Sequence, residues 1–184
     1  EGYQHGNKHA MEKWVDAYQG SLGIALTDTF GTNTFFDDFD MKYAKLFDGV
    51  RHDSGDPIKF AYNVIEHYKK LGIDPKDKSI VFSDGLNLDK IKHIQETCNN
   101  IIKTAYGIGT NLTNDVDSEP LNIVIKLVEI DGKPAVKLSD ELGKHTGDEE
   151  TIRYLKWLFD YVDKTKIEKL VEKAESVTKP LDHG

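Results

Sequence analysis

The sequence has little of what disulfide-linked, zinc-binding or membrane-spanning proteins need. Cys98 is the only cysteine among 184 residues, which excludes an intrachain disulfide and a cysteine-based zinc site. The seven histidines show no metal-ligand spacing, and no apolar stretch approaches the roughly 20 residues of a membrane span. No signal peptide is visible either. These absences predict a cytoplasmic protein with no membrane partner.

Positive charge is also scarce. Lysine and arginine number 24 against 32 acidic residues, so the formal net charge is −8. A nucleic-acid-binding domain would present a basic face, so we expect no nucleic-acid partner. Phosphate binding is not excluded, because backbone amides at helix N-termini can bind phosphate without net positive charge.

Four apolar runs recur along the chain, and a polar stretch follows each of them. The runs are Gly23–Leu26, Phe47–Val50, Lys78–Phe82 and Ile101–Ala105. Amphipathic patterns follow the first three, and repeated strand–loop–helix units are typical of a parallel sheet with crossover helices. Ligand sites in such sheets lie at the carboxyl ends of the strands, where the polar stretches fall. The organisation therefore predicts an α/β enzyme site.

Helix periodicity and capping residues predict where the helices lie. The expected helices are Gly6–Tyr18, one or two within Asp28–Phe47 with Asp40 capping the second, one from Pro57 to Leu71 capped by Asp56, one capped by Asn87, and a tail from Asp148 to Val177. Trp14, Trp157 and Cys98 are expected in the core. The first and last predicted strands are Leu22–Leu26 and Ile101–Tyr106.

The pattern changes after Asn114. The runs Leu121–Ile130 and Pro134–Leu138 flank Asp131-Gly132, which is a strong signal for a two-residue hairpin turn. Four parallel strands do not close a barrel, which normally needs about eight. The sequence thus predicts either an open sheet or half of an α/β barrel, with a hairpin and helices at the C-terminal end.

The motif between Arg51 and Pro57 carries the strongest signal for chemistry. Arg51 offers a planar fork of donors suited to carboxylate or phosphate. Asp53 suits sugar hydroxyls or a water-bound magnesium ion, and Ser54 and Gly55 offer donors near a helix N-terminus. The alternative is an Arg–Asp ion pair beside an ordinary helix cap.

Two glycine-containing motifs follow the last two runs. Asp84 and Gly85 come one unit after the arginine motif, although an Asp-Gly pair also makes a plain turn. Gly107 and Gly109 let the backbone approach an anion, and Thr110 adds a hydroxyl, although a plain loop would look similar. Phosphate sites of α/β barrels frequently lie at the last two such loops. Together the two motifs favour phosphate binding.

Asp28 follows the first run and is a candidate for the same edge of the sheet. A helix N-cap is at least as good an interpretation of this residue.

The ordered set of motifs resembles the nicotinate phosphoribosyltransferase family over nearly the whole chain. The matching stretches are Leu26–Gly31, Phe47–Pro57, Phe82–Leu86 and Gly107–Asp115. The long Arg-x-Asp-Ser-Gly-Asp-Pro and Gly-x-Gly-Thr-Asn-Leu sequences are the specific part of the resemblance.

The resemblance implies a reaction that joins nicotinate to phosphoribosyl pyrophosphate. The products are nicotinate mononucleotide and pyrophosphate, ATP is hydrolysed as a co-substrate, and magnesium is required. It also implies NAD salvage, an irregular TIM-like α/β barrel of the type II phosphoribosyltransferase kind, an N-terminal sheet domain and a homodimer.

Residue roles follow from the resemblance position by position. Arg51 and Asp53 become the catalytic pair: Arg51 clamps the pyridine and phosphate region, and Asp53 holds the ribose hydroxyls or the metal-bound pyrophosphate. The product phosphate lies against the glycine motifs. The implied substrate-binding residues are Asp28, Ser54, Asp84, Gly85, Gly107, Gly109, Thr110 and Asn111.

One departure concerns the family's phosphorylatable histidine, whose motif is missing from this sequence. We therefore expect residues 1–184 to be a single region, the C-terminal half of the barrel domain without the N-terminal domain, and inactive alone. Three alternatives stay open. The first is a nicotinamide-using relative, which tends to carry proline at the position of His52. The second is a magnesium-dependent phosphate-ester hydrolase built on Asp28, Asp53, Asp56 and Asp84. The third is a non-catalytic binding domain.

Overall fold

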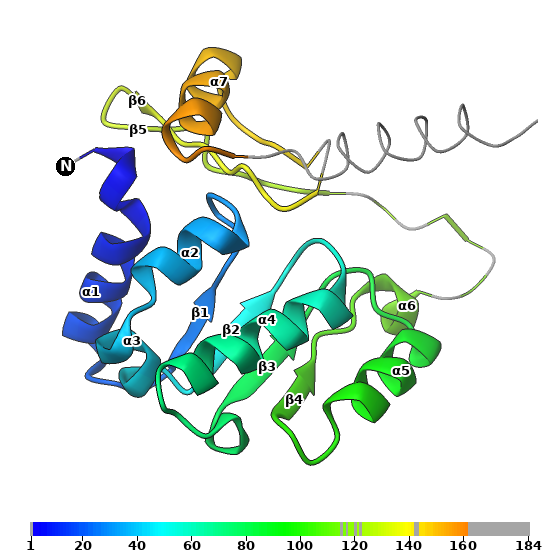
Figure 1. Cartoon of the computed structure of the whole chain (residues 1–184). Helices are drawn as coiled ribbons and strands as arrows, with labels where there is room; N and C mark the ends of the chain where they lie inside the picture. Colours follow the sequence, from blue (N-terminus) through cyan, green and yellow to red (C-terminus); the bar gives the residue numbers. More distant parts are fainter. Residues whose placement is uncertain are drawn as a thin grey trace, which may run out of the picture.

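Four parallel strands form the central sheet in the computed structural model, which describes residues 2–114, 116, 118, 119, 121, 123–141 and 144–161 (Figure 1). The sheet order β1-β2-β3-β4 is the order of the strands in the chain, and every neighbouring pair is parallel. This confirms the predicted α/β fold with a parallel sheet. The strands are β1 (Ile24–Leu26), β2 (Gly49–His52), β3 (Ser79–Phe82) and β4 (Lys103–Tyr106).

Two strands begin later than the apolar runs suggest. Leu22 has a φ of 54°, which lies in the left-handed region and cannot continue a strand, so β1 starts at Ile24. Ile101 belongs to the turn after a helix, where its amide donates to the carbonyl of Cys98, and β4 starts at Lys103. Both corrections are local effects of backbone geometry that hydrophobicity does not report.

Helices connect and flank the strands, and α4 and α5 lie along one face of the sheet in Figure 1. None of the helices in the described ranges is long and apolar enough to cross a membrane. The helices are α1 (Gly6–Tyr18), α2 (Thr32–Asp38), α3 (Met41–Leu46), α4 (Pro57–Lys70), α5 (Leu88–Cys98), α6 (Thr110–Thr113) and α7 (Glu149–Leu158), with short 3-10 turns η1 (Tyr3–His5) and η2 (Pro75–Asp77).

Three of these helices begin at the expected caps, and α7 is capped by Asp148, where the helical tail was expected to start. Asp40 accepts hydrogen bonds from the amides of α3, Asp56 from those of α4, Asn87 from that of Lys90 in α5, and Asp148 from that of Thr151 in α7. Each cap satisfies an amide that has no partner inside its helix, which is why these positions were readable from the sequence.

The main core is aromatic and lies between the sheet and its helices. Phe35 and Phe39 stack with ring centroids 4.8 Å apart, and Phe39 meets Tyr68 edge-on at 6.3 Å. Val50 and Ile80 of the two central strands are fully buried beneath them. Cys98 is buried as expected.

The expectation for the tryptophans is wrong. Trp14 is 40% exposed and Trp157 is 77% exposed. Helix α1 buries Met11, while the Trp14 ring lies against Tyr18 and its Nε1 donates to the carbonyl of Leu22 at 3.0 Å. An apolar stripe identifies the face of a helix that can be buried, but not how much of that face a neighbour covers.

The hairpin prediction holds for the turn and fails for the strands. Asp131 and Gly132 have φ values of 50° and 71° and connect β5 (Glu129–Ile130) to β6 (Lys133–Pro134). The described residues of the run from 121 to 128 have no regular structure, and their large apolar side chains are exposed. The Asp-Gly turn forms from local backbone preferences, whereas longer pairing needs neighbouring strands.

A second, smaller apolar cluster fixes the C-terminal part of the described chain. Phe30, Leu138 and Leu155 are buried together, and the Phe30 and Phe159 rings stack at 4.9 Å. Helix α7 and the segment after the hairpin thereby pack near the carboxyl end of β1. The rest of the predicted helical tail, from residue 162, lies outside the described residues.

We predict that Gly49→Ala lowers the free energy of unfolding by about 3 kcal/mol. A Cβ on Gly49 would lie 2.0 Å from the carbonyl oxygen of Ser79, so two central strands would have to separate. Gly2→Ala is the control, because its added Cβ would meet nothing closer than 3.9 Å. Urea titration measures both, and equal stabilities would contradict the close strand contact.

Candidate active site

The polar motifs meet at one edge of the sheet because the strands are parallel and lie side by side in chain order. Leu26 pairs with Arg51, and His52 pairs with Phe82. Hydrogen bonds extend the ladder past the strands: Thr27 Oγ1 donates to the Arg51 carbonyl at 3.1 Å, and Ser83 Oγ donates to the His52 carbonyl at 2.9 Å. The loops after β1, β2 and β3 are therefore held side by side.

Asp28 is the deepest charged group at this edge, with its side chain 1% exposed. Its Oδ2 accepts from Ser54 Oγ at 2.6 Å and from Ser139 Oγ at 3.4 Å, and lies 3.0 Å from Lys137 Nζ. Asp28 does not cap a helix, because the N-cap of α2 is Gly31. The alternative interpretation of Asp28 is thus wrong, and the residue belongs to the cluster at the strand ends.

Asp53 lies beside Asp28 and is held by three groups. Ser83 Oγ donates to its Oδ1 at 3.0 Å, Lys137 Nζ donates to its Oδ2 at 3.0 Å, and Arg51 Nη2 is 3.8 Å from Oδ1. Burial raises the pKa of the Asp53 carboxyl, but the hydrogen bond and charge of Lys137 outweigh it and bring the pKa below its usual value. Asp53 is therefore a carboxylate at neutral pH.

Lys137 is the central residue that the sequence motifs do not reveal. Its ammonium bridges the two carboxylates, and although burial lowers its pKa, hydrogen bonds to Asp28 and Asp53 raise it above the usual lysine value. Lys137 lies in the apolar run after the hairpin turn, where a single charged residue is a weak signal. We name Asp28, Asp53 and Lys137 the carboxylate–lysine cluster.

The segment around Lys137 is fastened to the loop after β1. Amides of Leu138 and Ser139 donate to the carbonyls of Thr29 and Asp28 at 2.7 and 3.1 Å. Asp140 then accepts from the amide and the hydroxyl of Thr32, and its own amide donates to Ser54 Oγ at 3.0 Å. These bonds fix the backbone that carries Lys137.

Asp84 and Gly85 follow β3 at the same edge. Lys144 Nζ lies 2.8 Å from Asp84 and 2.7 Å from Glu141. Gly85 has a φ of 53°, and its carbonyl accepts from Lys90 Nζ at 2.9 Å. Burial lowers the pKa of Lys144, but the hydrogen bonds to Asp84 and Glu141 outweigh it and raise the pKa above the usual value, so a second lysine also neutralises a carboxylate here.

The glycine motif after β4 lies next to Ser83. The Gly107 amide continues the ladder to the Phe82 carbonyl at 2.8 Å, and a Cβ on Gly107 would contact Ser83 at 3.4 Å. A Cβ on Gly109 would meet nothing within 4 Å, so this backbone is open, and Thr110 begins α6 directly after it. Asn111 Nδ2 donates to the Leu86 carbonyl at 2.8 Å and thereby joins the last two loops.

His52, which follows Arg51 in the arginine motif, is buried against aromatic side chains of the core. Its ring is 2% exposed and packs against Phe60 and Phe82, with centroid distances of 4.9 and 5.7 Å. Nε2 lies 3.2 Å from the Gly55 carbonyl and so carries the proton, while buried Nδ1 has no hydrogen-bond partner among the described residues. Burial removes water from the ring and lowers the pKa of His52, and this outweighs the opposite effect of the nearby Asp84, Asp28 and Asp140 carboxylates.

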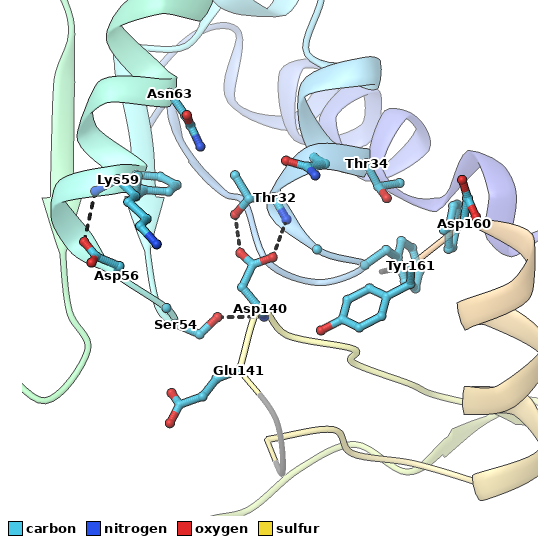
Figure 2. A pocket seen from close by; sticks show the side chains of 16 residues that line it. Thr32, Thr34, Ser54, Asp56, Lys59, Asn63, Asp140, Glu141, Asp160 and Tyr161 are labelled. Carbon is cyan, nitrogen blue, oxygen red and sulfur yellow. Dashed lines mark hydrogen bonds between the residues drawn. The ribbon is translucent and has the colours of Figure 1, made fainter. Parts of the chain in front are cut away.

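The Ser54–Asp140 hydrogen bond lies in the wall of a cavity of about 350 Å³ (Figure 2). Its lining includes Phe60 and Asn63 of α4, Thr34 of α2, and Tyr161. Among the predicted site residues, Ser54 lines it. The cavity therefore lies next to the carboxylate–lysine cluster, and the three residues of the cluster do not line it.

The sequence from residue 1 to residue 163 matches the model of the nicotinate phosphoribosyltransferase (NAPRTase) family. The chain belongs to this family. The match spans most of the chain, and it confirms the resemblance inferred from the motifs.

Curated relatives share this assignment. The nicotinate phosphoribosyltransferase of Desulforapulum autotrophicum is 57% identical over 159 residues, which are 83% of this chain and 41% of that protein. The one of Chromohalobacter salexigens is 54% identical over 160 residues, covering 84% of this chain and 41% of that protein. The chain therefore spans about two-fifths of the length of these relatives.

Solved structures agree. A nicotinate phosphoribosyltransferase from Porphyromonas gingivalis superposes with a TM-score of 0.82 at 46% identity, covering 86% of this chain and 43% of the other. One from Vibrio cholerae gives 0.83 at 38% identity, covering 94% and 43%. The α/β architecture with its parallel sheet is thus that of structures of the same family.

We predict that Lys137→Met lowers the free energy of unfolding at pH 7 by about 2 kcal/mol, because it leaves buried Asp28 and half-buried Asp53 without their cation. The folded-state pKa of Asp53 is lowered, so its stabilisation is present above the ordinary value of 3.8 and disappears as the pH falls through the folded value. The loss caused by the substitution should shrink toward pH 3 in urea titrations. An equal loss at pH 7 and pH 3, or an equal loss in Lys137→Arg, would contradict an electrostatic role.

A second prediction concerns His52, whose folded-state pKa is lowered from 6.5. A lowered pKa means that the unfolded chain binds the proton first, so stability is full above 6.5 and falls with acidification. His52→Gln keeps an N–H donor for Gly55 without titrating. The variant should lose less stability than the wild type between pH 7.5 and 5, by up to about 2 kcal/mol. Parallel urea titrations at both pH values measure the difference, and identical losses would contradict the prediction.

Proposed function

We propose that this chain carries the phosphoribosyl pyrophosphate side of a nicotinate phosphoribosyltransferase site. The reaction joins nicotinate to phosphoribosyl pyrophosphate, with ATP hydrolysis, and yields nicotinate mononucleotide and pyrophosphate. The carboxylate–lysine cluster at the strand ends is the observation that carries the proposal. Its acidic members lie inside the stretches that match the family, and Arg51 lies beside them.

The architectural proposal is that residues 1–184 are a single region forming about half of a TIM-like α/β barrel. Sequential order of four parallel strands supports this, because a barrel places each strand beside the next one in the chain. The other half, the N-terminal domain and a second subunit would complete the enzyme. We expect the 184-residue chain to be inactive alone, since it spans about two-fifths of its relatives.

The proposed chemistry is a displacement at the anomeric carbon of the ribose. The ring nitrogen of nicotinate attacks that carbon, the bond to the pyrophosphate oxygen breaks, and pyrophosphate leaves. Arg51 would clamp the pyridine and phosphate region with its planar donors. Asp53, ionised at neutral pH, would accept hydrogen bonds from the ribose hydroxyls. The protein contributes mainly positioning and charge stabilisation.

Magnesium fits the donor set of the cluster. Asp28 and Asp53 offer carboxylate oxygens, and the buried Oδ1 of Asp28 has no hydrogen-bond partner among the described residues. Mg²⁺ in such enzymes is usually held by one or two carboxylates together with substrate phosphates. When bound, it would neutralise the charge that develops on the leaving pyrophosphate.

The product phosphate is assigned to the loops after β3 and β4. The open backbone at Gly109, the hydroxyl of Thr110 and the loop at Gly85 support this assignment. Lys144 already neutralises Asp84 there, which reduces the repulsion that an anion would meet.

The hydrolase alternative is weaker on this geometry. A hydrolase built on four carboxylates needs Asp56, but Asp56 is engaged as the N-cap of α4. Within the described residues, no three acidic or histidine side chains gather as metal ligands. A nicotinamide-using relative shares the arginine motif and tends to differ at the position of His52, so substrate preference is the measurement that separates the two.

The test is phosphoribosyl transfer by the full-length protein with nicotinate, nicotinamide and quinolinate, each with and without ATP. We expect mononucleotide formation from nicotinate, stimulated by ATP. Transfer to nicotinamide alone would assign the relative instead. No transfer to any of the three would leave a binding domain.

We further predict that Asp53→Ala lowers turnover at least about tenfold, equivalent to about 1.4 kcal/mol of transition-state stabilisation. Asp89→Ala is the control, because Asp89 lies on the exposed side of α5 with its side chain 93% exposed. Steady-state kinetics of both variants decide the point. Unchanged kinetics in Asp53→Ala would remove this residue from the site.

A further inference from the structure

Lys137 holds the position where a cation would bind between two carboxylates. Its Nζ is 3.0 Å from Asp28 Oδ2 and 3.0 Å from Asp53 Oδ2. We propose that Lys137 excludes a free divalent cation from this position, so that the cation binds tightly only together with a diphosphate group, which gives the ammonium another partner. The proposal rests on the proposed function and goes beyond it by assigning an order to binding.

Local charge supports this exclusion. The two carboxylates of the cluster face the ammonium of Lys137, and the exposed guanidinium of Arg51 lies outside the cluster, 3.8 Å from Asp53. A free divalent cation therefore meets carboxylates whose charge is already partly offset and faces an ammonium already in its place. A diphosphate arriving with the cation supplies several negative charges, which offset the added positive charge.

The protein also has too few ligands for the cation alone. Asp28 and Asp53 are the acidic pair here, and no group of three potential metal ligands occurs in the part of the chain that the structure describes. Mg²⁺ demands about six oxygen ligands and commonly takes several from substrate phosphates and water. Asp28 Oδ1, buried and without a hydrogen-bond partner among the described residues, is an oxygen still available to it.

The ammonium can leave while its backbone stays. Hydrogen bonds from the Leu138 and Ser139 amides fix the chain next to Lys137. The side chains of Lys137 and Asp53 are 28% and 29% exposed, so solvent reaches both, whereas the side chain of Asp28 is 1% exposed. A rotation of the lysine side chain is enough to move the charge from the carboxylates to an incoming phosphate.

The test is Mn²⁺ binding to the full-length protein, counted by equilibrium dialysis with and without inorganic pyrophosphate. Dialysis separates protein-bound Mn²⁺ from the free Mn²⁺–pyrophosphate complex. We expect the wild type to bind free Mn²⁺ weakly, and pyrophosphate to lower the dissociation constant at least tenfold. If pyrophosphate leaves Mn²⁺ affinity unchanged, the proposal is wrong, and this measurement needs no variant.

Variants identify the lysine as the cause. Lys137→Met should bind free Mn²⁺ at least tenfold more tightly than the wild type and gain less from pyrophosphate, whereas Lys137→Arg should keep the weak binding. Lys69→Met removes the same charge from an exposed pair with Glu66 on α4 and should match the wild type. A folded Lys137→Met protein with wild-type affinity for free Mn²⁺ would overturn the proposal.

The outcome is separable from that of the proposed function. Mononucleotide formation from nicotinate without any pyrophosphate effect on Mn²⁺ binding would reject only the lysine's role. Absence of transfer would reject the proposed function, whatever the dialysis shows.

Discussion

The buried carboxylate of Asp28 is the constraint on which the site depends. An ionised group that is 1% exposed is costly unless charge and hydrogen bonds compensate for lost water, and a single partner rarely suffices. The compensation comes from two other parts of the chain, namely Ser54 after β2 and Lys137 and Ser139 after the hairpin. One charge placed just beyond β1 thus determines where a segment more than a hundred residues later must lie.

This constraint explains why the segment after the hairpin belongs to the site and is not an appendage. Lys137 of this segment is the cation of the cluster. Asp140 of the same segment accepts a hydrogen bond from the amide of Thr32, at the start of α2. Phe30 and Leu138 seal the same junction with apolar contact. The ends of the strands bring Asp28 and Asp53 together. Without Lys137 from the later segment, these two neighbouring carboxylates would have too little positive charge beside them.

Features fixed by local backbone physics could be predicted from the sequence, and features fixed by distant partners could not. The caps at Asp40 and Asp56 were readable because a cap involves residues only two or three positions apart. The Asp131-Gly132 turn was readable for the same reason, whereas the long strands expected beside it did not form. The tryptophans were misplaced because periodicity cannot tell whether a second surface arrives to cover a stripe.

The residues of the site also divide into those that could be predicted from the sequence and those that depend on distant partners. Asp28 and Asp53 could be placed together because parallel topology brings strand ends to one edge, a rule that needs no tertiary detail. Lys137 could not, since its contact with Asp53 spans 84 positions and no motif marks it. Charge balance was nevertheless a usable signal. Two acids predicted at one edge require a cation nearby, and Arg51, 3.8 Å from Asp53 and 43% exposed, is too solvated to compensate a carboxylate as deep as Asp28. A search for a lone lysine inside the later apolar runs would have returned two candidates, Lys126 and Lys137.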